Sequence, residues 1–205
     1  MRLLDFRGRL QGTPTIPLDL GGLHGLGQVT APDGATQERV GLDGKFFRLG
    51  HEKFWMKGVT YGPFKPREGS GVQLPEQVEL EADFRLIRGL GANTIRVYHV
   101  PPRDVLDTAQ SFGLKVLVDV PWSKHRCFLD SREDKESGRR AVREAARACK
   151  DHPALFGLSV VNEVPPDVVR WLGRERVEKF IDELVDIART EDPMALVTFA
   201  SFPST

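Results

Sequence analysis

The sequence predicts an α/β fold, namely a parallel (β/α)8 barrel of which this chain supplies about five strands before it stops, so that the barrel is truncated. Strand-like and helix-like segments alternate from residue 58 onward, which is typical of parallel βα units. The strand-like runs are apolar on both faces, as in a parallel sheet covered by helices. An open doubly wound sheet also alternates, but its glycine-rich first turn is missing here, so the barrel is favoured.

Composition excludes several classes of function. The chain has 205 residues with 29 basic and 29 acidic side chains, which suits one soluble domain and gives no support for nucleic acid or an anionic membrane as a partner. The two cysteines, Cys127 and Cys149, form no CxxC motif. Neither a signal peptide nor a transmembrane stretch is visible in this chain, so a cytoplasmic location is expected.

Residues 1–40 are predicted to be a flexible arm or linker, and residues 41–205 to be the barrel segment. The first region is rich in Gly, Pro and Thr and lacks sustained periodicity. Its run Gly21–Gly27 superficially suggests a phosphate loop. No strand precedes this run and no Lys-Ser/Thr follows it, so we reject that interpretation.

The ordered part begins with two strand-like runs, 42–49 and 53–59, in which Asp43-Gly44 and the break at 50–52 favour hairpin turns. Tyr61 then follows the first barrel strand. Downstream, the predicted strands are 92–100, 115–120, 155–161 and 195–200. The helices between them are predicted from apolar stripes, which are Leu80/Phe84/Ile87, Val105/Ala109/Phe112, Ala141/Ala145/Ala148 and Val177/Ile181/Leu184/Ala188.

Residues with polar, charged or aromatic side chains lie where these strands end. Right-handed crossovers place every strand end on one rim of the sheet, which is where catalytic groups gather in α/β barrels. The fourth strand ends abruptly in Asn162-Glu163 before two prolines, which makes Glu163 a candidate general acid. The residues expected at this rim are Tyr61, Arg96, Tyr98, His99, Asp119, Trp122, Asn162, Glu163, Ser201 and Phe202.

This set of side chains points to carbohydrate chemistry. Aromatic faces stack on sugar rings, while Asn and Arg form hydrogen bonds with hydroxyl groups and hold carboxylates ionised. A metal site would need several ligands at suitable spacing, and a lone His99 with scattered acids does not show one. A Ser-His-Asp hydrolase would need a Gly-x-Ser-x-Gly turn, which is absent. No metal or cofactor is therefore expected.

Three segments together resemble the catalytic barrel of glycoside hydrolase family 2 and its clan of retaining glycosidases. They are Gly58-Val59-Thr60-Tyr61, Asn93 to Pro101 with its Arg96…His99 pattern, and Val161-Asn162-Glu163. The lead-in Asp43-Gly44-Lys45 with Lys57-Gly58 is also similar to that family's entry into its barrel. The resemblance covers roughly residue 41 onward.

The resemblance implies roles for the matching positions. Glu163 resembles the general acid/base, Asn162 the neighbour that binds the sugar 2-hydroxyl, Arg96 the residue that orients the nucleophile, and His99 a substrate-pocket residue. Tyr61, Tyr98 and Trp122 are expected to line the sugar site. Thr60 and Gly62 depart from the Asn and His that family members often carry, a difference that concerns substrate specificity.

Each role competes with a structural one. Asn162-Glu163 could cap the following helix, Arg96 could belong to a structural ion pair with Asp119 or Glu163, and Trp122 could be a core residue. Two further functions also stay open. One is a non-catalytic carbohydrate-binding barrel fused to a glycosyltransferase module, since barrels of this family also occur in such proteins. The other is a metabolic barrel enzyme whose phosphate site lies in absent strands.

The resemblance also implies that the catalytic nucleophile is a Glu on a seventh barrel strand, which this chain does not supply. We therefore expect the 205-residue chain to be inactive by itself.

Overall fold

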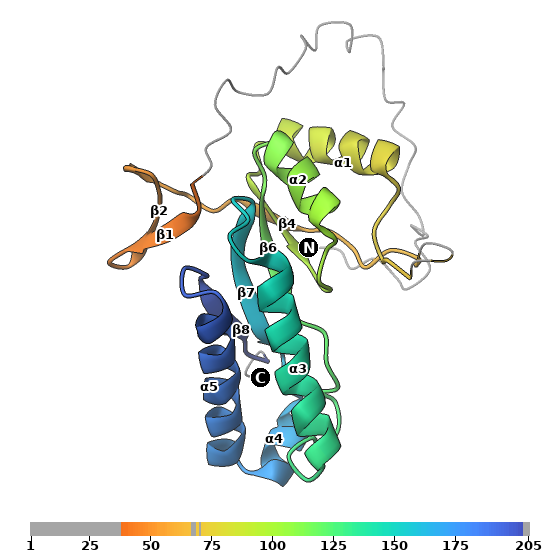
Figure 1. The fold of residues 1–205 in the computed structure, drawn as a ribbon, viewed down its shortest axis with the longest axis vertical. Coiled ribbons are helices and arrows are strands. Elements are labelled where there is room, and N and C mark those ends of the chain that lie inside the picture. The colour runs from red at the N-terminus through yellow and green to blue at the C-terminus, as the bar shows by residue number, and fades with distance from the viewer. Residues whose placement is uncertain (1–37, 67–68, 70, 203–205) are drawn as a thin grey trace, which may run out of the picture. The chain divides into compact units, whose positions relative to one another are not determined.

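The computed structural model describes residues 38–66, 69 and 71–202 of the chain (Figure 1). The arm predicted for residues 1–40 lies outside these residues except for its last three positions. The described part contains two sheets. One is a three-stranded sheet near its N-terminal end, and the other is a five-stranded sheet that carries the rim residues.

The three-stranded sheet is an antiparallel meander of β1 (Val40–Asp43), β2 (Phe46–Leu49) and β3 (Glu52–Lys53). Both predicted hairpin turns are confirmed, because Asp43 pairs with Phe46 and Leu49 pairs with Glu52. Gly44 and Gly50 supply the positive φ angles of 58° and 60° that these tight turns require.

The prediction of one strand over 53–59 is wrong. Residues 54–57 leave the antiparallel sheet and lead into the parallel one, so the run is divided between β3 and β4 (Gly58–Thr60). Aromatic packing explains where the chain changes sheets. The rings of Phe47 and Phe54 both lie against Phe156, with centroid distances of 4.9 and 6.1 Å, which joins the meander to β7 (Leu155–Asn162) of the parallel sheet.

The five-stranded sheet is entirely parallel, and its strands lie side by side in chain order. A doubly wound sheet would reverse its strand order at a switch point, and no reversal occurs here, so the sheet is an arc of a TIM barrel. Its remaining members are β5 (Thr94–Val97), β6 (Lys115–Asp119), β7 (Leu155–Asn162) and β8 (Val197–Ala200).

Helices connect the strands, and all but the one over Pro166–Leu172 are predicted from the sequence. They are α1 (Gln77–Gly89), α2 (Arg103–Ser111), α3 (Arg132–Cys149), α4 (Pro166–Leu172) and α5 (Arg174–Glu191). In Figure 1, α3 and α5 lie side by side along one part of the sheet, with α4 at their lower end. Of the helices in the described ranges, none combines the length and apolar character that crossing a bilayer requires.

The helix stripes fit the predicted periodicity with one exception. Leu80, Phe84 and Ile87 are the buried residues of α1, as predicted. In α3, however, Ala148 is exposed, so its predicted inward orientation is wrong. The stripe of α3 follows Val142, Ala146 and Cys149, spaced i, i+4, i+7, and Ala148 is turned about 100° away from Cys149.

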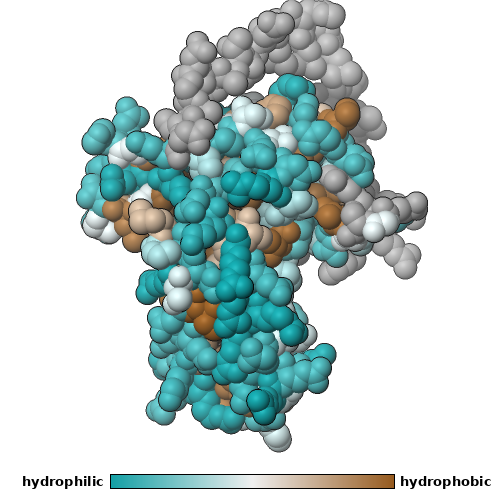
Figure 2. All heavy atoms as spheres, in the orientation of Figure 1, coloured by the Kyte–Doolittle hydropathy of each residue, from teal (hydrophilic) through white to brown (hydrophobic). Residues whose placement is uncertain are grey.

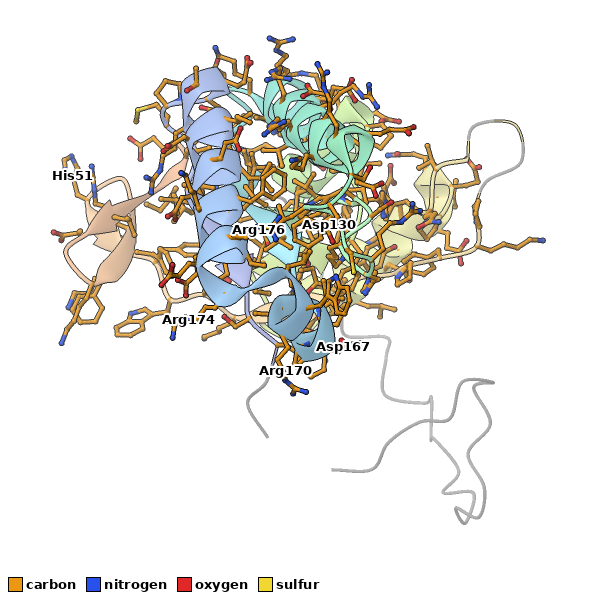
Figure 3. All side chains as sticks on the ribbon, turned by 90° about the horizontal axis from the view of Figure 1, so that it is seen from below. His51, Asp130, Asp167, Arg170, Arg174 and Arg176 are labelled. Carbon is orange, nitrogen blue, oxygen red and sulfur yellow. The ribbon has the colours of Figure 1, made fainter. Side chains whose placement is uncertain are left out.

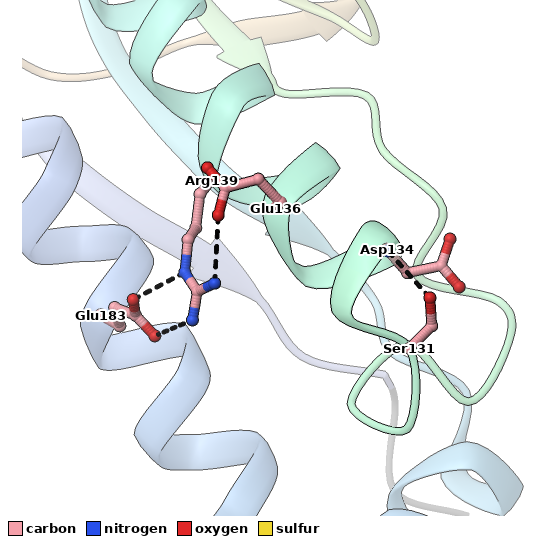
Figure 4. A network of polar contacts seen from close by, with 5 residues as sticks. All are labelled: Ser131, Asp134, Glu136, Arg139 and Glu183. Carbon is pink, nitrogen blue, oxygen red and sulfur yellow. Dashed lines mark hydrogen bonds and ion pairs between the residues drawn. The ribbon is translucent and has the colours of Figure 1, made fainter.

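Polar contacts tie α3 to α5 on the outer side of the barrel segment (Figure 4). Arg139 of α3 donates from Nε and Nη2 to the two carboxylate oxygens of Glu183 on α5, at 2.7 and 3.1 Å, and also contacts Glu136. The Ser131 hydroxyl accepts a hydrogen bond from the Asp134 backbone N–H and so caps α3. Figure 2 shows that the surface over these helices is mainly hydrophilic.

Helix α4 is not predicted from the sequence, in which Pro165 and Pro166 indicate only the end of a strand. Pro166 instead starts a short helix, because the first helical position needs no backbone N–H donor. The far end of α4 contacts the loop before α3. The Trp171 indole N–H donates to Asp130 at 3.3 Å, and Arg176 of α5 approaches the same carboxylate at 3.5 Å (Figure 3).

Strand β7 departs from regular pairing at two places. Its register shifts opposite β6 between Val116 and Leu117, and opposite β8 between Ser159 and Asn162. Gly157 lies between these irregularities and approaches the chain before β8 closely. A Cβ added at Gly157 would lie 2.7 Å from the Leu196 carbonyl oxygen, which is closer than real Cβ contacts allow.

We expect Gly157→Ala to destabilise the protein by about 1–3 kcal/mol, because backbone atoms of a neighbouring strand must shift to admit the methyl group. Urea denaturation measures the loss. Gly89→Ala at the end of α1 is the control, since its added Cβ meets nothing within 4 Å. Equal stability of the two variants would show that the approach of Leu196 to β7 is not tight.

Candidate active site

The rim of the five-stranded sheet gathers several of the predicted residues on one face. Side chains alternate along a strand. Ile95 and Val97 of β5 are fully buried in the hydrophobic core, so Arg96 between them lies on the opposite face, and it is only partly buried there. The sheet thus has one apolar face inside the core and one face that offers polar groups.

Arg96 contacts the two strands that follow it in the sheet. Its Nε donates to Asp119 Oδ2 on β6 at 2.5 Å, and its Nη2 donates to Asn162 Oδ1 on β7 at 2.9 Å. The guanidinium also lies over the Tyr98 ring, 5.2 Å from its centroid. The hydrogen bond to Asp119 raises the pKa of Arg96 above its ordinary value, and its charge is therefore permanent. The contact with Asp119 is one of the two structural ion pairs that the sequence left open for Arg96, and its role toward a nucleophile stays a prediction.

Asp119 is the most deeply buried charged group of this cluster, with 2% of its surface exposed. It is the last residue of β6. Arg96 donates hydrogen bonds to both Asp119 and Asn162 and so links the two side chains. Its Oδ1 atom is buried and has no hydrogen-bond partner among the described residues. Because a buried carboxylate needs a counter-charge, the Arg96–Asp119 pair fixes both side chains against the sheet.

Asn162 and Glu163 lie at the carboxyl end of β7, as predicted. Asn162 pairs with Ala200 of β8, and the Glu163 backbone N–H donates to the Ala200 carbonyl at 3.0 Å. Glu163 itself has φ of 58°, in the left-handed region that side chains other than glycine rarely adopt. Such conformations cluster at active sites, because the surrounding structure must hold them in place. The Glu163 charge acts on the pKa of Arg96, so the two side chains share one electrostatic environment.

Tyr98 and His99 lie beside this cluster, on the exit from β5. Together with Gln73, Val100 and Pro121 they line a hollow of about 350 Å³. Both ring nitrogens of His99 are buried and unpartnered within the described part of the chain. Burial lowers the pKa of His99, which keeps the imidazole uncharged at neutral pH.

The structure does not bring Tyr61 and Trp122 into the polar cluster. The Tyr61 ring is buried against Phe64 and Phe84, and its hydroxyl donates to Asp83 of α1 at 2.7 Å. Burial, with the Asp83 carboxylate, raises its pKa.

Trp122 packs edge-on against Phe128 and Phe180, beneath α3 and α5. Its indole N–H donates to the Val160 carbonyl at 2.8 Å. Both aromatic side chains therefore have packing roles, and their contact with a sugar stays a prediction.

Lys124, in the loop after β6, is not predicted from the sequence as a residue near the site. The side chain is partly buried, and it lies near enough to Asp119 and Glu163 for both charges to act on its pKa. A lysine in a loop gives no sequence signal of its own, because loops are commonly charged. Within the described ranges, no three His, Cys, Asp or Glu side chains gather as metal ligands.

Taken together, the strands form a parallel barrel segment that carries a carboxylate in a left-handed backbone conformation at its rim. Comparison with known families agrees and is more specific. Residues 40–204 match the family described as "Glycosyl hydrolases family 2, TIM barrel domain". The chain therefore belongs to this family.

Curated relatives are named β-glucuronidases. The chain is 28% identical over 172 residues to the enzyme of Paenibacillus borealis, covering 80% of this chain and 28% of that protein. It is 26% identical over 158 residues to the human enzyme, covering 76% of this chain and 23% of the human protein. The chain thus spans less than a third of the length of these relatives.

Solved structures show the same fold. The GH2 β-galacturonidase of Eisenbergiella tayi, bound to galacturonate, has a TM-score of 0.65 at 23% identity, with 80% of this chain and 28% of that chain covered. The β-glucuronidase of Parabacteroides merdae has a TM-score of 0.64 at 21% identity, with 78% and 20% covered.

We expect Asp119→Ala to cost about 1–3 kcal/mol of stability, because Arg96 loses its counter-charge while still partly buried. The matched control is Glu178→Ala, which breaks the exposed pair with Arg174 and should cost less than about 1 kcal/mol. Thermal and urea unfolding of both variants measure the difference. Equal small losses would mean that the Arg96–Asp119 pair does not stabilise the rim.

Proposed function

We propose that the protein carrying this chain is a retaining glycoside hydrolase that cleaves O-glycosyl bonds with Glu163 as its general acid/base. One observation carries the proposal. In a chain of glycosyl hydrolase family 2, Glu163 ends a parallel barrel strand directly after Asn162, whose side chain is bonded to Arg96. The left-handed backbone of Glu163 supports the same assignment.

The reaction follows from the two-carboxylate mechanism. In the first step, protonated Glu163 gives its proton to the glycosidic oxygen while a second carboxylate attacks the anomeric carbon, so that the C–O bond to the leaving group breaks. In the second step, the Glu163 carboxylate takes a proton from water, whose oxygen displaces the enzyme carboxylate. The sugar is released with its anomeric configuration retained.

Arg96 and Asn162 are proposed to orient the reactants. Arg96 fixes the Asn162 amide, because its N–H donates and the oxygen is the atom of that amide that accepts, so Oδ1 is turned toward β5. The Nδ2 group of Asn162 is then free to donate to an acceptor such as a sugar 2-hydroxyl. The remaining N–H groups of Arg96 can hold the nucleophilic carboxylate, as the planar guanidinium forms several hydrogen bonds in fixed directions.

The nucleophile is proposed to lie outside the described residues. Retaining enzymes need it about 5–5.5 Å from the acid/base. Asp119 is the other carboxylate of the described cluster, and it is bonded to Arg96 and deeply buried. The relatives are more than three times longer than the matched segment, which leaves ample chain for the missing strands.

The substrate is proposed to be a carbohydrate, with hexuronides as the first class to test, because the relatives are named β-glucuronidases and one structural neighbour β-galacturonidase. Thr60 lies at the end of β4, at a position where family members often carry Asn. We propose that this difference affects which sugar the rim accepts.

We expect Glu163→Gln in the full-length protein to lower kcat/KM about 10²–10⁴-fold on glycosides with poor leaving groups, because proton donation is lost. Aryl glycosides with good leaving groups should lose less in the first step, since they depart without a proton. Added azide should restore part of the turnover by replacing the water that Glu163 activates. Steady-state assays of p-nitrophenyl and alkyl glucuronides measure both effects.

An exposed carboxylate provides the control for this experiment. Glu178→Gln on α5 keeps the fold and lies in a surface ion pair, so its kinetics should equal those of the wild type. If Glu163→Gln behaves like Glu178→Gln on every substrate, Glu163 is not the acid/base.

We expect residues 1–205 by themselves to hydrolyse aryl glycosides no faster than buffer, because a retaining reaction without its nucleophile stops before the first intermediate. The measurement compares this chain with the full-length protein after size-exclusion chromatography of both. Activity in the isolated chain would place the nucleophile among its own residues and contradict the assignment above.

A further inference from the structure

A β-bulge lies in β7 directly before the candidate site. Ser159 and Asn162 of β7 are three residues apart, whereas their partners on β8 are two residues apart. Val160 and Val161 therefore lie together opposite a single residue of β8, which is the arrangement of a bulge. Pairing resumes after it, since the Glu163 backbone N–H donates to a carbonyl of β8 at 3.0 Å. The irregular stretch thus ends where the proposed acid/base begins.

The bulge decides which face of the sheet Asn162 occupies. Ser159 pairs with Asp119 of β6, so the side chains of this pair lie on the same face. Asp119 binds Arg96, which identifies that face as the polar one. Regular alternation from Ser159 would place Val161 on the polar face and Asn162 on the opposite one. Asn162 nevertheless accepts a hydrogen bond from Arg96 at 2.9 Å, so the extra residue turns it to the polar face.

Both carbonyl groups of the bulge accept hydrogen bonds from side chains. The Ser159 hydroxyl donates to the Val161 carbonyl at 3.0 Å, and this serine is only 2% exposed. The Trp122 indole N–H donates to the Val160 carbonyl at 2.8 Å from the loop after β6. Breaking a buried hydrogen bond leaves a donor without water, so such bonds hold their partners in one orientation. The two bonds therefore fix both peptide groups of the bulge.

Trp122 can hold the bulge because its own ring is fixed in the helix layer. It packs edge-on against Phe128 and Phe180, with centroid distances of 5.0 and 6.0 Å. A Cβ added at Gly138 of α3 would lie 3.5 Å from the indole, so α3 also borders the ring. The place of the indole N–H, and with it the Val160 carbonyl, is thus set by packing against α3 and α5.

We propose that Ser159 and Trp122 are positioning residues, which hold the bulge and so aim Asn162 and Glu163 at the substrate. They act through the backbone of β7 and not on the sugar itself. The proposal rests on the proposed function, because it takes Glu163 to be the proton donor. Glu163 has φ of 58°, a conformation that persists only where the surrounding structure holds it, and a bulge bonded from two sides supplies that support.

The test uses the full-length protein with Ser159→Ala, with Trp122→Phe and with both substitutions together. Each substitution removes one donor and keeps most of the packing, since Phe retains an aromatic ring. Matched controls remove the same donors elsewhere. Ser111→Ala removes a hydroxyl bond to a backbone carbonyl of α2, and Trp171→Phe removes an indole bond to Asp130.

The first readout compares two leaving groups. Ser159→Ala and Trp122→Phe should each lower kcat/KM for methyl β-D-glucuronide about 5- to 50-fold, because a displaced acid no longer reaches the glycosidic oxygen. p-Nitrophenyl β-D-glucuronide needs little proton donation. The ratio of its kcat/KM to that of the methyl glycoside should therefore rise about fivefold or more. The two controls should keep the wild-type ratio.

This ratio separates positioning from a purely structural role. A loss of folded protein lowers both values of kcat/KM by the same factor and leaves their ratio unchanged. An unchanged ratio in Ser159→Ala and Trp122→Phe, measured below their melting temperatures, would overturn the proposal. Because the wild type is active in that experiment, the proposed function would stand.

Crystal structures of the variants decide the matter if the wild type hydrolyses neither glycoside, a result that counts against the proposed function. In the double variant, or in the single variants if the double one does not fold, the 2.9 Å bond between Asn162 and Arg96 should be lost. Glu163 should also leave its φ of 58°. A site unchanged in these variants would contradict the proposal, since Ser159 and Trp122 would then not be what holds the bulge.

Discussion

The guanidinium of Arg96 joins three neighbouring strands of the barrel segment at one point. It is anchored on β5, takes the carboxylate of Asp119 at the end of β6, and holds the amide of Asn162 at the end of β7. Backbone hydrogen bonds of the parallel ladder set the register of these strands. Charged hydrogen bonds are directional, so the Arg96 side chain adds a further link that holds the three strand ends together.

The barrel architecture could be predicted from the sequence because its signals are local. Runs such as Leu155–Val161 are apolar on both faces, and Gly91 and Gly113 end helices where the periodicity stops, both with positive φ angles in the structure. The predictions of strand boundaries are wrong where contacts between distant residues determine the local structure. The change of sheet within residues 53–59 depends on Phe54 packing against Phe156, a contact far apart in the chain that no local pattern contains.

In the candidate site, too, some residues could be predicted from local sequence and others could not. Arg96, Asn162 and Glu163 could be placed at the rim, because each follows from its position at the end of a strand. Tyr61 directly follows β4 as well, yet its side chain is buried beside α1, where its hydroxyl donates to Asp83. Lys124 could not be found, because a loop residue gains its surroundings only when the loop is attached elsewhere, here through Trp122 and Val160.

The register shift between β7 and β8 also bears on how this barrel can change during evolution. Ser159 and Asn162 are three residues apart, whereas their partners Thr198 and Ala200 are two apart, so β7 carries one extra residue just before the site. A bulge of this kind reverses which face the following side chains occupy. Deleting that one residue would turn Asn162 away from Arg96 without altering any residue of the site. If recombination between relatives exchanges part of β7, the site is therefore conserved only when the exchanged segment includes both the bulge and Asn162.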